Sequence, residues 1–238
     1  IFGKSYGTKI SGQVFINGKE VKLNTVQEAI DNKLAYVTED RKGNGLILSK
    51  SIKMNTSLAN MKGISNGKVI DADKEYAIAE EYRKKLKTKC PSVEQNVGNL
   101  SGGNQQKVLL AKWMFAEPDI LILDEPSAGL DPLKRMEMQK LIAELSKDKI
   151  IIFATHVVSD VESIADEYLI LKKGKLLRKE TRKQLVSLLE HKVMEQEVDP
   201  LEYQKLKTNN KISNVRYDGD KMMIRIIEPK DEGKGIYV

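Results

Sequence analysis

Residues 100–107 read Leu-Ser-Gly-Gly-Asn-Gln-Gln-Lys, and this stretch decides the expected fold. Ser101 is a favourable helix N-cap, and residues 105–116 have helix-forming composition. Gly102 and Gly103 let a phosphate approach the backbone at the helix start, where free N–H groups and the helix dipole attract an anion. Ser-Gly-Gly alone, however, is usually just a loop that enters a helix. Its meaning depends on a second stretch further along the chain.

That second stretch, residues 120–125, reads Ile-Leu-Ile-Leu-Asp-Glu and is followed by Pro126. Its aliphatic run predicts a strand of a parallel sheet that is buried on both faces. The strand would deliver Asp124 and Glu125 at its carboxyl end, where paired acids suit Mg²⁺ binding and the activation of water. Taken alone, four aliphatic residues before an acid describe many parallel strands.

Together, in this order and with a helix-length spacer, the two stretches resemble the signature and Walker B motifs of the ATP-binding cassette (ABC) ATPases. The resemblance runs from about residue 10 to residue 177. It implies an α/β fold, a P-loop NTPase-like ABC ATPase core in which helices flank a parallel sheet, with a helical subdomain at roughly residues 44–117. We expect this core to span residues 1–179, followed by a small C-terminal α+β appendage over residues 180–238.

Two further segments resemble motifs of this family. Glu39 stands where the family has its Q-loop glutamine, and residues 39–42, Glu-Asp-Arg-Lys, resemble the second ATPase half of sugar importers. A charged turn after a strand is the alternative interpretation. Residues 127–131, Ser-Ala-Gly-Leu-Asp, resemble the D-loop, and Asp131 is expected to reach across to a second ATPase domain. A plain turn into a helix would have a similar sequence.

Residues 150–155 are predicted to form another buried strand, and His156 follows it. A histidine at a strand end is more often structural than catalytic, but the carboxyl edge of a parallel sheet is where ligands bind. The resemblance implies that His156 is the switch histidine that contacts the γ-phosphate. It also implies that Glu125 polarises the attacking water, and that Asp124, with Glu39, binds Mg²⁺.

ABC ATPases act as dimers in which the P-loop of one domain holds ATP and the signature motif of the other covers it. The resemblance therefore implies that this chain covers its partner's nucleotide with Asp131 and with the start of the signature helix, namely Ser101, Gly102, Gly103, Asn104 and Gln105. The implied cofactors are ATP and Mg²⁺. The implied partners are a second ABC ATPase domain, in a homo- or heterodimer, and a transmembrane permease.

The phosphate loop is not found in the sequence. Gly3-Lys4-Ser5 has the ending of one, but only five residues separate Ser5 from Ser11, too few for the helix that must follow. Residues 1–3 look instead like the end of that helix. We expect the P-loop, its lysine and the adenine-stacking aromatic upstream of this chain. In the family fold we expect their strand to lie beside residues 120–124, so that its absence leaves a gap there.

Composition limits the possible settings. The 238 residues carry a net charge of +6, 40% hydrophobic residues and a single cysteine, Cys90, which cannot form an internal disulfide. A reducing cytosol is therefore expected, and we find no signal peptide or apolar run of bilayer length. Basic residues are densest at residues 83–89 and lack interleaved aromatics, so a basic face near a membrane is favoured over nucleic-acid binding. We predict a cytoplasmic protein on the inner face of the membrane.

Three functions from different classes are compatible with these features. The first is an ATP-hydrolysing subunit that powers substrate movement through a separate permease. The second is a non-hydrolysing module that lends its signature motif to a partner ATPase, which the missing Walker A motif favours for this chain as it stands. The third, a cassette protein acting on ribosomes or DNA, normally has two cassettes or a long coiled coil, and neither is visible.

The motifs form a mosaic. Residues 39–42 and 100–107 look like a sugar importer's second half, whereas residues 129–132, Gly-Leu-Asp-Pro, and His156 are exporter-type features, so the substrate is left open.

The other predicted elements are a strand over residues 13–16 with an Asn17-Gly18 turn, a helix over 24–33, a strand over 34–37, a helix over 73–86, a hairpin over 168–177, a helix over 181–189, a break at Pro200, and a hairpin around Asp218-Gly219.

Overall fold

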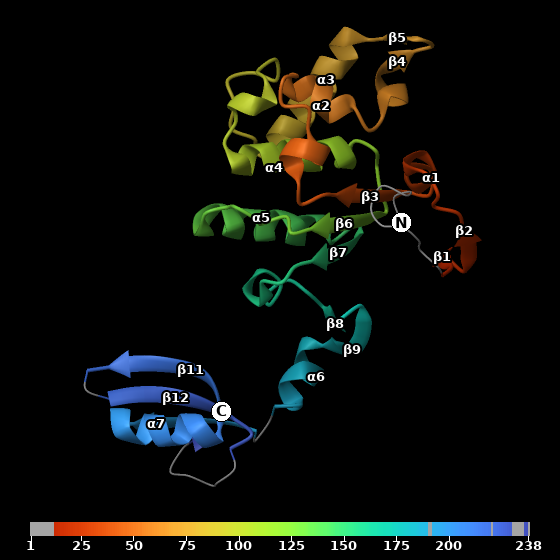
Figure 1. Ribbon diagram of the computed structural model, residues 1–238. Helices are drawn as coiled ribbons and strands as arrows, with labels where there is room; N and C mark the ends of the chain where they lie inside the picture. The colour runs from red at the N-terminus through yellow and green to blue at the C-terminus, as the bar shows by residue number, and fades with distance from the viewer. Residues whose placement is uncertain (1–11, 190–191, 220, 230–235, 238) are drawn as a thin grey trace. The chain divides into compact units, whose positions relative to one another are not determined.

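The computed structural model describes residues 12–189, 192–219, 221–229 and 236–237 (Figure 1). The chain divides into two units, Ile1–Ile164 and Ala165–Val238. The Gly3-Lys4-Ser5 segment lies outside the described residues. The predicted boundary after residue 179 stays a prediction. The division in the structure falls after residue 164 and groups the hairpin of residues 167–181 with the second unit.

A three-stranded parallel sheet forms the base of the first unit. Its strands are β3 (Leu34–Val37), β6 (Ile120–Asp124) and β7 (Ile150–Ala154), in the order β3-β6-β7. The register pairs Val37 with Leu123, and Asp124 with Ala154. The predicted parallel sheet is thus confirmed, and the carboxyl ends of β6 and β7 lie side by side.

Two expectations about this sheet are wrong. Only one face of β6 is fully buried, at Leu121 and Leu123, and on β7 Ile150 and Ile152 are 62% and 44% exposed. The expected gap beside β6 is absent from the described sheet, because β3 pairs with one edge of β6 and β7 pairs with the other. A further parallel strand could join the described sheet of this unit only at β3 or β7.

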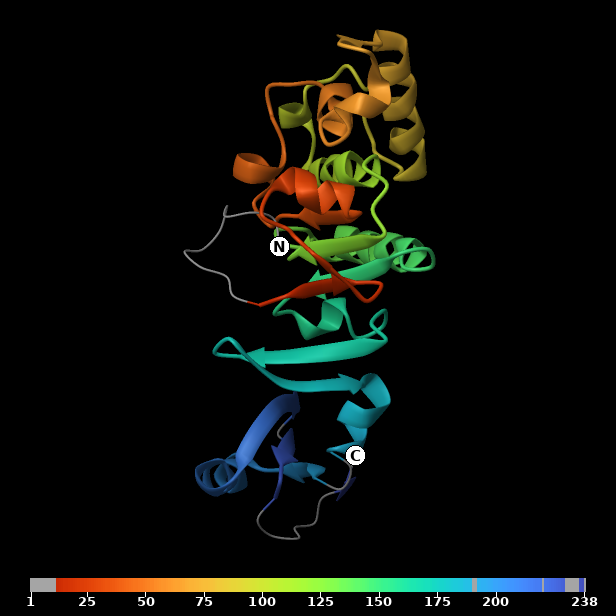
Figure 2. The ribbon, with the colours of Figure 1, turned by 90° about the vertical axis from the view of Figure 1, so that its right-hand side faces the viewer.

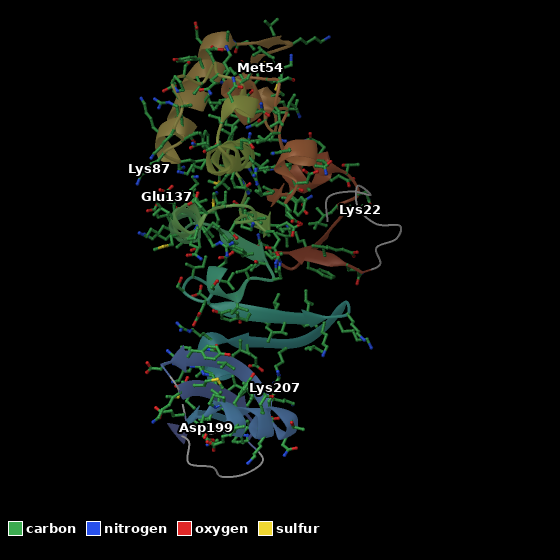
Figure 3. All side chains as sticks on the ribbon, turned by 60° about the vertical axis from the view of Figure 1, so that its left-hand side comes forward. Lys22, Met54, Lys87, Glu137, Asp199 and Lys207 are labelled. Atoms are coloured by element: carbon green, nitrogen blue, oxygen red, sulfur yellow. The ribbon has the colours of Figure 1, made fainter. Side chains whose placement is uncertain are left out.

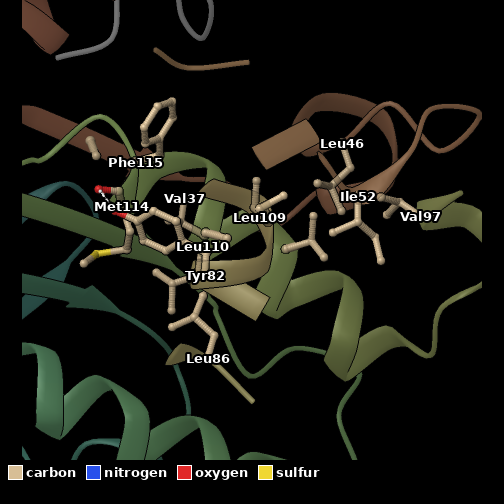
Figure 4. Packing of buried hydrophobic residues seen from close by; sticks show 14 of the residues in the cluster. Val37, Leu46, Ile52, Tyr82, Leu86, Val97, Leu109, Leu110, Met114 and Phe115 are labelled. Atoms are coloured by element: carbon tan, nitrogen blue, oxygen red, sulfur yellow. Dashed lines mark hydrogen bonds between the residues drawn. The ribbon is translucent and has the colours of Figure 1, made fainter. Parts of the chain in front are cut away.

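The rest of the first unit surrounds α4 (Gly102–Met114). Figure 2 shows α4 between the sheet and the elements α2 (Ile52–Ser57) and α3 (Ala72–Lys85). In Figure 4, Leu109 and Leu110 of α4 pack in one cluster with Tyr82 of α3, whose hydroxyl donates to Met114 O at 3.0 Å. This cluster fixes α4, and therefore the signature segment at its start, relative to the sheet.

The remaining elements complete the first unit. The predicted strand over residues 13–16 is present as β1 (Val14–Ile16), and it forms a hairpin with β2 (Lys19–Val21). The hairpin turns at Asn17 and Gly18, both with positive φ, as expected of a type I′ turn. The others are α1 (Val26–Asp31), the π-helical turn η1 (Arg41–Gly45), η2 (Met61–Ile64), β4 (Ser65–Asn66), β5 (Val69–Ile70), η3 (Val97–Asn99), α5 (Pro132–Leu145) and η4 (Val158–Asp160).

The second unit has its own sheet and core. After the hairpin β8 (Glu167–Lys172) and β9 (Lys175–Thr181) and the helix α6 (Arg182–Ser187), a sheet forms in the order β11-β12-β10-β13. Its strands are β10 (Val193–Val198), β11 (Lys211–Asp218), β12 (Lys221–Ile227) and β13 (Ile236–Tyr237). Buried methionine and isoleucine side chains of β10 and β12 pack against α7 (Pro200–Asn209).

The expected break at Pro200 is wrong. Pro200 is the first residue of α7, where its missing N–H costs nothing, and Asp199 caps the helix by accepting from the N–H groups of Leu201 and Glu202 at 2.8 Å. Figure 3 labels Asp199 and Lys207, which lie toward opposite ends of this helix. No helix among the described residues is long and apolar enough to cross a membrane.

Candidate functional site

The carboxyl ends of β6 and β7 bring Glu125 and His156 together. Glu125 Oε1 accepts hydrogen bonds from the backbone N–H of His156 at 2.8 Å and lies 2.6 Å from its Nδ1, while Thr155 Oγ1 donates to Oε2 at 2.9 Å. The Glu125 side chain is 14% exposed and that of His156 is 85% exposed. One carboxylate is therefore held by three donors beside an imidazole that faces solvent.

Both backbone and electrostatics fix Glu125. Its φ of 42° is in the left-handed region, unusual for a residue with a side chain, and its N–H donates to Ala154 O at 2.9 Å. Burial by itself would raise the pKa of Glu125, but the hydrogen bonds from Thr155 and His156 outweigh it and hold that pKa below its usual value. Glu125 is thus ionised at neutral pH, and its carboxylate can accept a proton.

The neighbouring acid, Asp124, is held by a residue that the sequence analysis did not select. Tyr36 of β3 donates its hydroxyl proton to Asp124 Oδ2 at 2.7 Å, across the paired strands β3 and β6. Glu39, the other expected metal ligand, is exposed. It follows β3 at the sheet edge where the paired strand β6 ends in Asp124.

The donor set fits a metal ion that arrives with a nucleotide. No group of three or more His, Cys, Asp or Glu side chains among the described residues is arranged to hold a metal on its own. Magnesium in nucleotide sites usually takes one or two carboxylates together with phosphate oxygens and water. Tyr36 engages one oxygen of Asp124, and the other suits such an ion.

The loops after β6 and β7 are joined a second time by a buried acid. Asp160 of η4 is 0% exposed, and its Oδ2 accepts a short hydrogen bond from Ser127 Oγ. Its other oxygen accepts from Gln139 Nε2 at 3.3 Å and lies 3.4 Å from Arg135 Nη1. Ser127 lies in the segment before α5, and Gln139 and Arg135 belong to α5 itself. Asp160 therefore ties both this segment and α5 to the loop that carries His156.

Asp131 stands at the start of α5. Its side chain caps the helix by accepting from the Lys134 N–H at 3.0 Å and also binds Lys134 Nζ at 2.6 Å. These hydrogen bonds lower the pKa of Asp131. The aliphatic part of Lys134 also covers Gly103, since a Cβ atom there would lie 2.8 Å from Lys134 Cδ. Asp131 and the start of α4 are thus neighbours.

At the start of α4, the signature residues adopt part of the predicted arrangement. Ser101 occupies the N-cap position, but its hydroxyl accepts from Asn104 Nδ2 at 3.1 Å instead of capping the helix. Asn104 Oδ1 in turn accepts from the Lys89 N–H at 2.9 Å. Gln105 is buried and donates from Nε2 to Val97 O at 3.2 Å. Ser101 thus stands at the predicted N-cap position, but its side chain does not make the hydrogen bond of a helix cap.

A cavity of about 920 Å³ opens in the same unit. Its lining includes Val26 of α1, Tyr36 of β3 and Met61 of η2, together with Lys112 and Trp113 of α4. Burial lowers the pKa of Lys112, which donates to Gly45 O at 3.0 Å. The cavity therefore combines apolar side chains with a partly buried cation.

Comparison with known proteins identifies the family. Residues 4–128 match the ABC transporter family, and the chain belongs to that family. The L-arabinose transport ATP-binding protein of Geobacillus stearothermophilus is 44% identical over 77% of this chain and 36% of its own length. The ribose import ATP-binding protein of Clostridium tetani is 42% identical over 74% of this chain and 35% of its own length. The chain spans about a third of these relatives.

A solved structure supports the fold. The ATP-binding cassette MJ0796, in a dimeric post-hydrolysis state with ADP and phosphate bound, superposes with a TM-score of 0.60. The identity is 21%, over 72% of this chain and 73% of that one. The first unit thus has the P-loop NTPase-like ABC ATPase fold.

Proposed function

We propose that this chain is part of an ATP-binding and ATP-hydrolysing subunit of an ABC transporter, which powers substrate movement through a separate permease. The observation that carries the proposal is Glu125, a carboxylate held by Thr155 and His156 at the end of β6. Family membership supplies the reaction class, hydrolysis of ATP.

In this proposal each residue has one task. Glu125 accepts the proton of the attacking water at a carboxylate oxygen, and His156 contacts the γ-phosphate. Asp124, with Glu39, would hold Mg²⁺, which when bound neutralises charge on the phosphate oxygens. Tyr36 fixes one oxygen of Asp124 and so limits how that carboxylate can turn.

The chain would also complete a partner's site. Ser101, Gly102, Gly103, Asn104 and Gln105, with Asp131, would cover a nucleotide held by a second ABC ATPase domain, in a homo- or heterodimer. The neighbourhood of Gly103, Lys134 and Asp131 supports this, because one surface carries both segments.

We propose that the cavity beside α1 and α4 receives a cytoplasmic loop of the permease. Val26, Leu58 and Met61 are 43%, 40% and 38% exposed around it, which is apolar surface suited to a partner helix. Docking there would place the subunit in the cytoplasm on the inner face of the membrane, and no role for nucleic acid is proposed.

The proposal also covers the source of the phosphate loop and the class of substrate. Residues 1–238 contain no complete Gly-x-x-x-x-Gly-Lys-Ser/Thr pattern, so another segment or subunit would supply the loop. The names of the arabinose and ribose relatives favour sugar-importer descent, and residues 129–132 and His156 have the exporter-like form described above. We propose the mosaic as a feature of this chain and assign no single substrate.

Titration with labelled Mg·ATP tests the proposal. The 238-residue chain alone should bind weakly, with a Kd of roughly 1 mM or above, because the amides and lysine of a phosphate loop supply most of the attraction for a triphosphate. Adding the arabinose-transport relative should produce tight binding that includes this chain. A Kd near 1 μM for the chain alone would contradict the proposal and point to an unrecognised phosphate site. If the partner adds binding without hydrolysis, the non-hydrolysing signature module would be the better description.

A further inference from the structure

Arg41 lies where three segments of the first unit meet. Its Nε donates to Gln105 Oε1 at 3.4 Å, and its Nη1 donates to Ala128 O at 3.3 Å. Gln105 belongs to the first turns of α4, whereas Ala128 belongs to the turn between β6 and α5. A single guanidinium therefore joins the signature segment to the segment that leads to Asp131.

Gly102 leaves the space that the guanidinium occupies, and Gly129 lies at ordinary contact distance from it. A Cβ atom on Gly102 would lie 2.8 Å from Arg41 Nη2, and one on Gly129 would lie 4.0 Å from the same nitrogen. Contact at 2.8 Å is closer than real Cβ atoms tolerate, so any side chain at Gly102 would displace Arg41. Gly129 also has a φ of 67°, which a residue with a side chain rarely adopts.

The backbone of Arg41 is itself held in place. Asp40 caps η1 by accepting from the Gly43 N–H at 2.9 Å, and Arg41 O accepts from the Leu46 N–H at 2.8 Å. At the other end of η1, Lys112 of α4 donates to Gly45 O. Arg41 thus projects from a turn that is closed by its own hydrogen bonds and is tied to α4 at Gly45.

We propose that Arg41 is a positioning residue that keeps the start of α4 and the Ala128–Gly129 turn at a fixed spacing, so that both segments cover a partner's nucleotide together. The inference rests on the proposed function and adds to it a residue outside the nucleotide contacts. A planar guanidinium makes two bonds in fixed directions, which the ammonium of a lysine cannot reproduce. The role thus depends on geometry as well as charge.

The test measures association of the full chain with the arabinose-transport relative, with and without Mg²⁺ and a non-hydrolysable ATP analogue. Arg41→Ala should weaken the nucleotide-dependent association about 10-fold, and Arg41→Lys should restore it only in part. Lys42→Ala removes the same charge from the same turn, at an exposed side chain, and should change the association less than about 2-fold. Association without nucleotide should be the same for all variants.

A second variant separates positioning from general loss of structure. Gly102→Ala should weaken the association when Arg41 is present and cost clearly less in the Arg41→Ala background, because the added methyl group then meets no guanidinium. Equal binding by Arg41→Ala and the unaltered chain would overturn the inference, as would an equal loss for Lys42→Ala. If the unaltered chain shows no nucleotide-dependent association, the proposed dimer fails, and the inference with it.

Discussion

The two units differ in how their polar side chains are used. In the first unit, polar groups join segments far apart in sequence, as Tyr36 does with Asp124 and Ser127 with Asp160, and the latter acid is fully buried. In the second unit, the ion pair of Glu195 with Arg225 lies on an outer sheet face, and Gln196 on the buried face donates to Glu202 of α7. All ten candidate residues belong to the first unit. The proposed ATP chemistry is therefore to be tested in the first unit, and the second unit serves as an internal control.

The largest expected effect concerns the separate cores. Ile224 is 0% exposed in the small core beneath α7, and Leu109 is 0% exposed in the core of the first unit. Truncation to alanine should cost about 3 kcal/mol in either place, through lost burial and the cavity left behind. If the cores are independent, Ile224→Ala lowers only one of two calorimetric transitions and Leu109→Ala only the other. A single transition lowered by both changes would contradict the separation, and so would loss of cooperative unfolding on deleting residues 180–238.

A comparable effect, on rate instead of stability, is expected at Glu125. With a phosphate-loop segment fused ahead of residue 1, Glu125→Gln should slow ATP turnover about 10²-fold or more while ATP binding survives, because an amide accepts no proton from water. Glu195→Gln is the matched control in the second unit and should leave the turnover unchanged. Equal loss of binding and turnover in Glu125→Gln would argue against a hydrolytic role.

Local patterns predicted much of the first unit. The aliphatic runs at β6 and β7 and the helix-forming stretch after Ser101 correspond to elements of the structure, because they are signals from adjacent residues. Contacts across strands were missed. Tyr36 meets Asp124 only because β3 and β6 pair in one particular register, which no local pattern records.

In the second unit, too, a feature that the sequence did not predict depends on contacts between residues distant in sequence. The strand β10 escaped detection because Gln196, a polar residue, occupies one of its buried positions and donates to Glu202 of α7 at 3.1 Å. Pro200 by itself favours a break, whereas Asp199 before it gives the pair the form of a helix start. Arg41 and Asp160 likewise acquire their roles from partners distant in sequence.

The smallest expected effect concerns the exposed pairs of the second unit. Glu195 lies directly opposite Arg225 on β10 and β12 and accepts from its Nη2 at 2.6 Å, while Arg216 approaches to 3.8 Å. The Arg225 and Arg216 side chains are 44% and 67% exposed, so water and salt screen the attraction. Glu195→Gln should therefore destabilise the second unit by less than about 1 kcal/mol in urea unfolding, and the difference should shrink in about 1 M salt. A loss above about 2 kcal/mol that salt leaves unchanged would show that this pair works like the buried Asp160 cluster, and the contrast between the units would then fail.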